Sequence, residues 1–195
     1  MAGKATLRKQ MLQRREAAEP KNMAAASQKI CDRFFAGFDL SEVKRLHIFL
    51  SIPEKNELNT WPIINKIWRD YPKIQLAVPV TPPGATELQH RLLGPKTVLL
   101  KSKWGIEEPT EASPLIAENE MDMVLVPLLA FDLRGHRVGY GKGYYDKFLS
   151  KCRPGVQKIG LSVFEPVEII SDAGDWDIKL DFCVTPGQVF AFDKK

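Results

Sequence analysis

Apolar residues recur at intervals of three and four in several segments of the chain, the spacing that places them on one face of a helix. The predicted helices cover residues 5–18, 22–35 and 60–71. Pro62 favours the first turn of the third helix, and Gly37 provides a stop after the second. A fourth helix is expected to follow a glycine-rich turn and to end near Cys152.

Between the helices, the pattern changes to the alternation or the short apolar run that is typical of strands. Residues 123–127 form an uninterrupted apolar run, as in a strand that is buried on both faces. Residues 107–122 hold six acidic residues, two prolines and no basic residue, which predicts an exposed loop. The other predicted strands cover residues 46–51, 74–80, 88–93, 98–101, 159–163 and 182–185.

Strand and helix patterns alternate along the chain, which predicts an α/β fold. We expect a single three-layer domain over residues 1–195, with a central, mostly parallel or mixed sheet flanked by helices. No linker-like break divides the 195 residues, so a second domain is not expected. The longest apolar run, residues 123–131, includes a proline and is far shorter than the ~20 residues that span a bilayer.

The formal net charge of +4 is concentrated at the N-terminal end of the chain. Residues 1–21 hold six Lys or Arg and two Glu, so the rest of the chain is neutral. Such a segment suits a nucleic-acid-binding arm, a membrane-surface helix or a local anion site. It lacks the apolar stretch of a secretory signal, and the three cysteines have no CxxC spacing, so we expect a cytoplasmic protein.

A glycine-rich segment between the buried strand and the fourth helix carries the candidate chemistry. Glycine allows the backbone to approach a ligand closely, and the free amides at the start of a helix attract an anion. Arg137 and Lys142 add full positive charges to this segment. Its four glycines are Gly135, Gly139, Gly141 and Gly143. The segment therefore predicts a phosphate-binding loop.

The spacing of these glycines fits neither the GxxxxGK[ST] loop nor the GxGxxG fingerprint. A tight strand-to-helix turn is the simpler alternative, but such a turn does not require Arg137, Lys142, Tyr144 and Tyr145. Asp146 follows one turn into the helix. It suits a Mg²⁺ ion shared with a phosphate, or a carboxylate favoured by the helix dipole, and the residues alone leave both open.

The run from Phe131 to Asp146 resembles the hallmark of the 5-formyltetrahydrofolate cyclo-ligase family, Gly-Phe-Asp…Gly-x-Arg-Leu-Gly-x-Gly-x-Gly-Tyr-Tyr-Asp. The chain departs from it in three places: Leu129-Ala130 replaces the Gly before Phe-Asp, Val138 replaces Leu, and Tyr140 stands where some members carry Arg. Four more segments resemble the family in the same order: Lys4-Ala-Thr-Leu-Arg8, Phe49-Leu50-Ser51 with Glu57 and Thr60, Trp104-Gly-Ile-Glu-Glu-Pro109, and Leu180-Asp181 with Val184-Thr185.

The resemblance implies a ligase that uses MgATP to close 5-formyltetrahydrofolate to 5,10-methenyltetrahydrofolate, releasing ADP and phosphate, in one-carbon folate metabolism. It implies that ATP is held by Lys4, Arg8, Arg137, Gly139, Gly141, Lys142, Gly143, Tyr144 and Tyr145. It implies catalytic roles for Lys142, Arg137 and Tyr144. The folate would meet Leu50, Glu57, Tyr140, Gly141, Lys142, Gly143 and Tyr144, and Mg²⁺ would bind Asp146 and Asp181. Trp104 is expected to pack rather than to contact a ligand.

The excess charge then has a specific interpretation. Lys4 and Arg8 are four residues apart and share one helical face, which the resemblance brings to the ATP phosphates. Arg14, Arg15 and Lys21 are expected to be solvated surface residues.

Two other classes of function stay open on the residues. A nucleic-acid-binding protein fits the basic segment but not the neutral remainder. A different ATP- or sugar-phosphate-binding α/β enzyme shares the loop but does not explain the other matching segments. We therefore expect ATP and 5-formyltetrahydrofolate as partners, no nucleic acid, no membrane, and a monomer.

Overall fold

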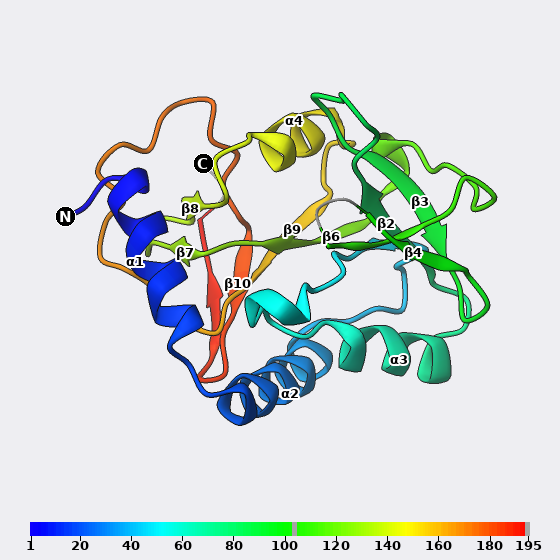
Figure 1. Cartoon of the computed structure of the whole chain (residues 1–195), viewed down its shortest axis with the longest axis horizontal. Helices are drawn as coiled ribbons and strands as arrows, with labels where there is room; N and C mark the ends of the chain where they lie inside the picture. The colour runs from blue at the N-terminus through cyan, green and yellow to red at the C-terminus, as the bar shows by residue number, and fades with distance from the viewer. Residues whose placement is uncertain (103–104, 194–195) are drawn as a thin grey trace.

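The computed structural model describes residues 1–102 and 105–193, and a seven-stranded sheet runs through its centre (Figure 1). The strand order is β11-β10-β9-β6-β1-β2-β3. The five inner strands are parallel, and the edge strands β3 and β11 are antiparallel to their neighbours. The bounds are β1 (Arg45–His47), β2 (Gln75–Val80), β3 (Gln89–Leu93), β6 (Met123–Pro127), β9 (Gln157–Leu161), β10 (Phe182–Val184) and β11 (Val189–Ala191). The predicted mostly parallel, mixed sheet is confirmed.

Helices cover both faces of this sheet, as the fold class requires. The helices are α1 (Lys4–Glu16), α2 (Pro20–Gly37), α3 (Trp61–Asp70) and α4 (Tyr144–Lys151), with 3₁₀ turns η1 (Pro53–Lys55) and η2 (Glu118–Glu120). Helices α2 and α3 pack on one face and α4 on the other, whereas α1 lies beside the small hairpin of β7 (Ala130–Phe131) and β8 (Arg137–Val138) (Figure 1). None of the described helices is long and apolar enough to cross a membrane.

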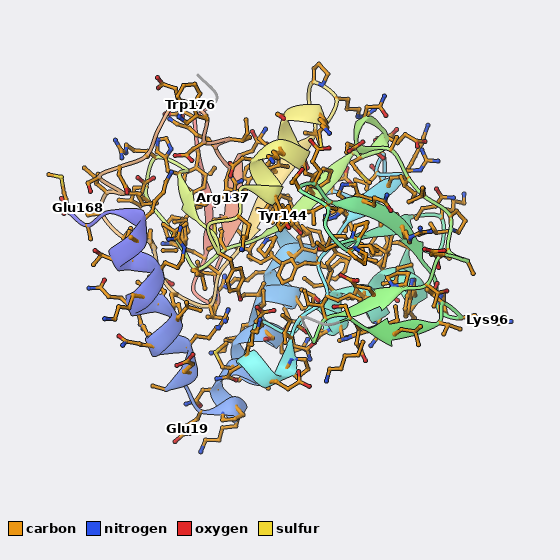
Figure 2. All side chains as sticks on the ribbon, turned by 45° about the horizontal axis from the view of Figure 1, so that its top comes forward. Glu19, Lys96, Arg137, Tyr144, Glu168 and Trp176 are labelled. Carbon is orange, nitrogen blue, oxygen red and sulfur yellow. The ribbon has the colours of Figure 1, made fainter. Side chains whose placement is uncertain are left out.

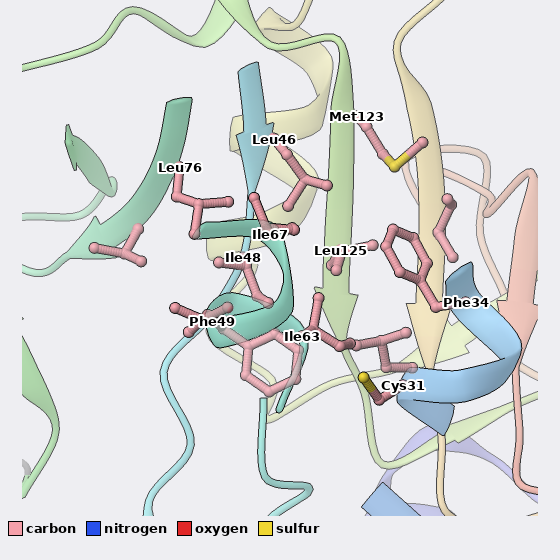
Figure 3. Close-up of a cluster of buried hydrophobic side chains, with 14 of the residues drawn as sticks. Cys31, Phe34, Leu46, Ile48, Phe49, Ile63, Ile67, Leu76, Met123 and Leu125 are labelled. Atoms are coloured by element: carbon pink, nitrogen blue, oxygen red, sulfur yellow. The ribbon is translucent and has the colours of Figure 1, made fainter. Parts of the chain in front are cut away.

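Strand β6 is buried on both faces because its side chains enter two different cores. Met123 and Leu125 join the cluster that α2 and α3 cover, where Phe34 and Ile63 are also buried (Figure 3). Val124 and Val126 point to the opposite face and pack in the cluster that contains Phe148 of α4. The apolar run of residues 123–127 was therefore interpreted correctly.

The sheet reverses its direction of growth between β1 and β6. From β1 the chain moves outward to β2 and β3, and from β6 it moves the other way, to β9 and β10. The loops that follow β1 and β6 therefore diverge at the carboxyl edge of the sheet. In open α/β sheets, this is where ligands bind.

One strand prediction and one loop prediction were wrong. The strand predicted over residues 46–51 ends at His47, although residues 48–51 remain buried as the chain leaves the sheet. The acidic segment predicted as an exposed loop begins with β5 (Glu107–Pro109), which pairs with β4 (Leu99–Lys101). Strands β7, β8 and β11 were not predicted, because each has only two or three residues.

Two histidines are buried against Phe148 of α4. His47 of β1 and His90 of β3 are 0% and 2% exposed, and their ring centroids lie 4.9 Å apart. Their four ring nitrogens have no hydrogen-bond partner among the described residues. Burial lowers the pKa of His47 well below its usual value and the pKa of His90 to about 4.

Mild acid should therefore destabilise the fold. The unfolded chain binds protons at both histidines near pH 6.5, but the folded protein does not bind one at His90 until about pH 4. Stability that is present above pH 6.5 is then lost as the pH falls, by about 1.4 kcal/mol per pH unit for each histidine. Denaturant unfolding between pH 6.5 and 5 measures this slope. His90→Phe should make the slope shallower, and an equally steep slope in the variant would contradict this account.

Candidate active site

The glycine loop, residues 139–143, connects β8 to α4 and brings backbone N–H groups to one place. Gly143 precedes the helix with φ 69°, and Gly141 has φ 88°, conformations that favour glycine. The Lys147 N–H donates to the Gly143 carbonyl at 3.1 Å, so the N–H groups of the three preceding residues have no acceptor within the helix. These amides and the positive end of the helix dipole can bind an anion.

Helix α1 lies against this loop. The Arg8 Nε donates to the Gly139 carbonyl at 2.9 Å, and a Cβ on Gly141 would lie 3.1 Å from the Arg8 guanidinium carbon. One turn earlier, the Lys4 ammonium pairs with the Asp177 carboxylate at 2.5 Å. Arg8 thus contacts the glycine loop, whereas Lys4 pairs with Asp177, a partner that the sequence did not indicate.

The two other cations near the loop, Arg137 of β8 and Lys142, differ in their surroundings. Arg137, which is labelled in Figure 2, is 7% exposed. It donates to Asp146 Oδ1 at 2.7 Å and to the Ile178 carbonyl. Lys142 is exposed and pairs with none of the residues that the structure describes. Arg137 is therefore held in place by its partners, whereas Lys142 is free to contact a ligand.

A second cluster joins the loop after β1 to the glycine loop. Tyr140 donates its hydroxyl hydrogen to Glu57 Oε1, and the Ile52 N–H donates to Glu57 Oε2 at 2.9 Å. Arg15 of α1 donates from Nη1 to the Tyr140 hydroxyl oxygen at 2.7 Å, and the same nitrogen lies 3.6 Å from Glu57 Oε1. Glu57 and Tyr140, both predicted for the folate, thus meet at the reversal point of the sheet.

Arg15 was predicted to be a solvated surface residue, and this was wrong. Its side chain is 9% exposed, because Tyr140 and the loop after β1 cover it. The side-chain amide of Asn56 donates to the Arg15 and Ala18 carbonyl oxygens, both at 2.8 Å, and so fastens the end of α1 to this loop. Arg14 and Lys21 are exposed, as predicted.

The hydroxyl of Tyr140 is held in its protonated form. Burial and the neighbouring Glu57 carboxylate raise the pKa of Tyr140 well above its usual value, and Arg15 offsets this only in part. Tyr140 therefore remains a hydrogen-bond donor to Glu57.

Three other predicted residues form no hydrogen bond or ion pair with this cluster in the described part of the chain. Asp181 Oδ2 accepts from the Lys158 N–H at 2.8 Å and lies 3.0 Å from the Lys158 ammonium, and the side chain is 7% exposed. The Tyr145 ring packs against the core cluster of α4, and Leu50 is 5% exposed in the other core cluster. Tyr144, by contrast, donates to the Ala85 carbonyl at 3.2 Å. Trp104 lies outside the described residues.

Among the described residues, no three His, Cys, Asp or Glu side chains gather as a metal site. Asp146 uses Oδ1 for both its contacts, with Arg137 and with the Ile178 N–H. Its Oδ2 has no partner in the described part of the chain, and the side chain is 36% exposed. A single open carboxylate suits a Mg²⁺ ion that takes its other ligands from phosphates and water.

A hollow in the surface lies elsewhere. It has a volume of about 700 Å³ and is lined by residues of the 80–83 turn, β3 and the 108–115 segment, including Arg91 and Glu108. No residue of the glycine loop or of α1 lines it. Its position therefore does not mark the place where Arg8, Glu57 and the glycine loop converge.

The sequence matches the 5-formyltetrahydrofolate cyclo-ligase family over residues 1–186. The chain belongs to this family. It is 30% identical over 186 residues to the 5-formyltetrahydrofolate cyclo-ligase of Escherichia coli, covering 91% of this chain and 97% of that protein. It is 28% identical over 188 residues to the cyclo-ligase of Mycoplasma genitalium, covering 96% of this chain and 100% of that protein.

Two solved structures share its fold. The 5,10-methenyltetrahydrofolate synthetase from Mycoplasma pneumoniae superposes with a TM-score of 0.75 and 25% identity, covering 94% of this chain and 98% of that one. The synthetase from Aquifex aeolicus gives 0.80 and 27%, covering 98% and 94%. The chain is therefore a member of a family of ligases with the same three-layer fold.

One signal in the sequence of this cyclo-ligase family member could have found Arg15. Residues 4, 8 and 15 lie on one face of a helix, since eleven residues make almost three whole turns. Arg14 is about 100° away from Arg15 around the same helix, and its guanidinium lies over the Phe164 ring instead. The position around the helix thus distinguishes the buried Arg15 from the exposed Arg14, although both contribute equally to the net charge.

Gly141→Ala should lower the free energy of unfolding by about 1–2 kcal/mol, because the left-handed backbone disfavours a side chain and the new methyl group meets Arg8. Gly139→Ala is the matched control, since a Cβ there has no described neighbour within 4 Å. Denaturant unfolding of both variants checks this, and equal losses would contradict it.

Proposed function

We propose that this chain is a 5-formyltetrahydrofolate cyclo-ligase, which uses ATP to form 5,10-methenyltetrahydrofolate and releases ADP and phosphate. Family membership over residues 1–186 supports the reaction. The observation that carries it onto this structure is the contact between Glu57 and Tyr140. It joins a carboxylate suited to a pterin to a loop suited to a triphosphate, at the point where the sheet reverses.

In the proposed reaction, the formyl oxygen attacks the γ-phosphorus of ATP, and ADP leaves. N10 of the folate then attacks the formyl carbon and gives up its proton to water, and the bond from that carbon to the phosphorylated oxygen breaks, which releases phosphate. The protein mainly needs to align the two substrates and to neutralise the phosphate charge. The residues around the glycine loop suit these two tasks.

We assign ATP to the N-terminal end of α4. Its β- and γ-phosphates would accept from the amides that begin the helix, and Lys142 would turn its free ammonium onto them. Arg8, held at the Gly139 carbonyl, would supply a second charge from α1, with Lys4 one turn away. Arg137 is buried and would act by holding Asp146, while the Tyr144 hydroxyl would tie the loop to residue 85.

The metal proposal is narrowed to one residue. Mg²⁺, when bound, would neutralise charge on the phosphates. Asp146 fits such an ion because Oδ2 is open beside the glycine loop. Asp181 is left out of this assignment, because its side chain is only 7% exposed and its Oδ2 already accepts from the N–H and the ammonium of Lys158.

We assign the pterin ring to Glu57. A carboxylate accepts two parallel hydrogen bonds, which the amino group and the adjacent ring N–H of a pterin can donate. In the free protein, Tyr140 donates to one of these oxygens, so the pterin would take its place. Leu50 is buried, so it would support this loop by packing in the core and would not contact the folate with its side chain.

The remaining assignments complete the proposal. We propose a single domain that acts as a monomer in the cytoplasm. The three cysteines are free thiols, and burial raises the pKa of Cys31 and of Cys152 to about 11. Unreactive, unpaired thiols suit a reducing compartment.

The purified protein with MgATP should convert 5-formyltetrahydrofolate to the methenyl product, which is followed by its near-ultraviolet absorbance. Lys142→Ala should lose most of this activity and keep the melting temperature of the wild type, because the side chain is exposed. Intact wild-type protein that forms no product would refute the proposed function. A Lys142→Ala variant with full activity per folded molecule would remove Lys142 from the site.

The two predicted metal ligands should respond differently to an amide. Asp146→Asn should raise the Mg²⁺ concentration needed for half-maximal activity by about ten-fold or more, because the open oxygen loses its charge. Asp181→Asn should leave the Mg²⁺ requirement unchanged. Both variants should lose thermal stability, because Asp181→Asn weakens the pair with Lys158 and Asp146→Asn weakens the pair with the buried Arg137, so the Mg²⁺ requirement is the readout that separates them. Magnesium titrations and melting curves of both variants check this, and the opposite assignment would contradict it.

A further inference from the structure

Arg15 carries a donor that the fold leaves unused. Its side chain is nine-tenths buried, yet its Nε–H has no hydrogen-bond partner among the described residues. Only Nη1 is engaged, with the Tyr140 hydroxyl. Buried polar groups are nearly always satisfied, so this N–H calls for an acceptor that the described residues do not supply, either water or a ligand.

The surroundings of Arg15 limit what this acceptor is. The guanidinium lies 3.6 Å from Glu57 Oε1 and its carbon lies 5.6 Å from the centroid of the Tyr140 ring. A pterin that displaces Tyr140 from Glu57 would also free the Nη1 donor of Arg15. One ligand would then meet a carboxylate and a guanidinium side by side.

A pterin ring matches this pair of groups. Along one edge it presents the C2 amino group, the N3–H and the C4 carbonyl oxygen, which are two donors followed by an acceptor. A carboxylate takes the two donors, and a cation beside it takes the carbonyl oxygen. Glu57 and Arg15 lie next to each other in the protein, as the two donors and the acceptor do on the ligand.

We propose that Arg15 determines substrate specificity by donating to the C4 carbonyl oxygen of the pterin, next to the two hydrogen bonds that Glu57 accepts. This inference rests on the proposed function. In the absence of the folate, Arg15 lies beside the Glu57 carboxylate, and Tyr140 hydrogen-bonds to both until the pterin displaces it. The cation comes from α1, so the same helix would contact both substrates, through Arg8 and Arg15.

The test uses Arg15→Met, which keeps the bulk of the side chain and removes every donor. Arg14→Met is the matched control, because Arg14 is the adjacent arginine on the exposed side of α1. The Arg15→Met variant should raise the Kd for 5-formyltetrahydrofolate by roughly 10- to 150-fold, as for the loss of a charged hydrogen bond. The Kd for ATP should change little, and Arg14→Met should bind both ligands as the wild type does.

A second ligand separates direct contact from support of Glu57. In the 4-amino-4-deoxy analogue, an amino group replaces the C4 oxygen. The wild type should discriminate strongly against this analogue, and Arg15→Met should lose much of that discrimination. Discrimination is the Kd for the analogue divided by the Kd for the folate. Any effect of the analogue on Glu57 is common to both proteins, so it cancels when the discrimination of the wild type is divided by that of Arg15→Met. Arg15→Lys, which keeps the charge on a different geometry, should recover the affinity only in part.

The outcomes are distinct. A wild type that forms the methenyl product, together with Arg15→Met that binds the folate normally, would overturn this inference alone. Arg15→Met with weaker folate binding and unchanged discrimination would reduce Arg15 to a partner of Glu57 and would also overturn it. A wild type without activity would overturn the proposed function and this inference with it. Melting curves ensure that each Kd refers to folded protein.

Discussion

Close contact between α1 and the glycine loop is the constraint on which the site depends. Arg8 donates to the Gly139 carbonyl, and its guanidinium occupies the space that a side chain at residue 141 would need. Because a helix moves as a rigid rod, displacing Arg8 would also displace Lys4 and Arg15. The glycines therefore position the cations of the first helix, in addition to exposing amides to a phosphate.

The buried charges of the site are stable because each has a partner. Arg137 pairs with Asp146, and Arg15 lies beside Glu57, so neither guanidinium is buried alone. An unpaired buried charge costs several kcal/mol. Each guanidinium can therefore be buried only where another element brings a carboxylate to it. The result is a site assembled from α1, the loop after β1 and the start of α4, where the sheet changes its direction of growth.

Periodicity predicted the regular elements well and the irregular ones poorly. The helices α1, α2 and α3 begin and end within two residues of their predicted bounds, and β6 has the predicted bounds. Strand β1 is shorter than predicted because residues 48–51 stay buried after they leave the ladder, so burial alone did not mark its end. Strand β5 was missed because Glu and Pro are poor strand formers, and only its distant partner β4 makes it a strand.

The sequence alone determined the α/β class, the face of α1 that carries Lys4 and Arg8, and the loop whose glycines resemble the cyclo-ligase family. Each of these follows from local spacing or from the conformational freedom of a single residue. Only the tertiary structure decided that Arg15 is buried on Tyr140, 125 residues away in the chain, and that Asp181 pairs with Lys158. Helical period fixes the direction in which a side chain points, but what lies opposite depends on how distant segments pack.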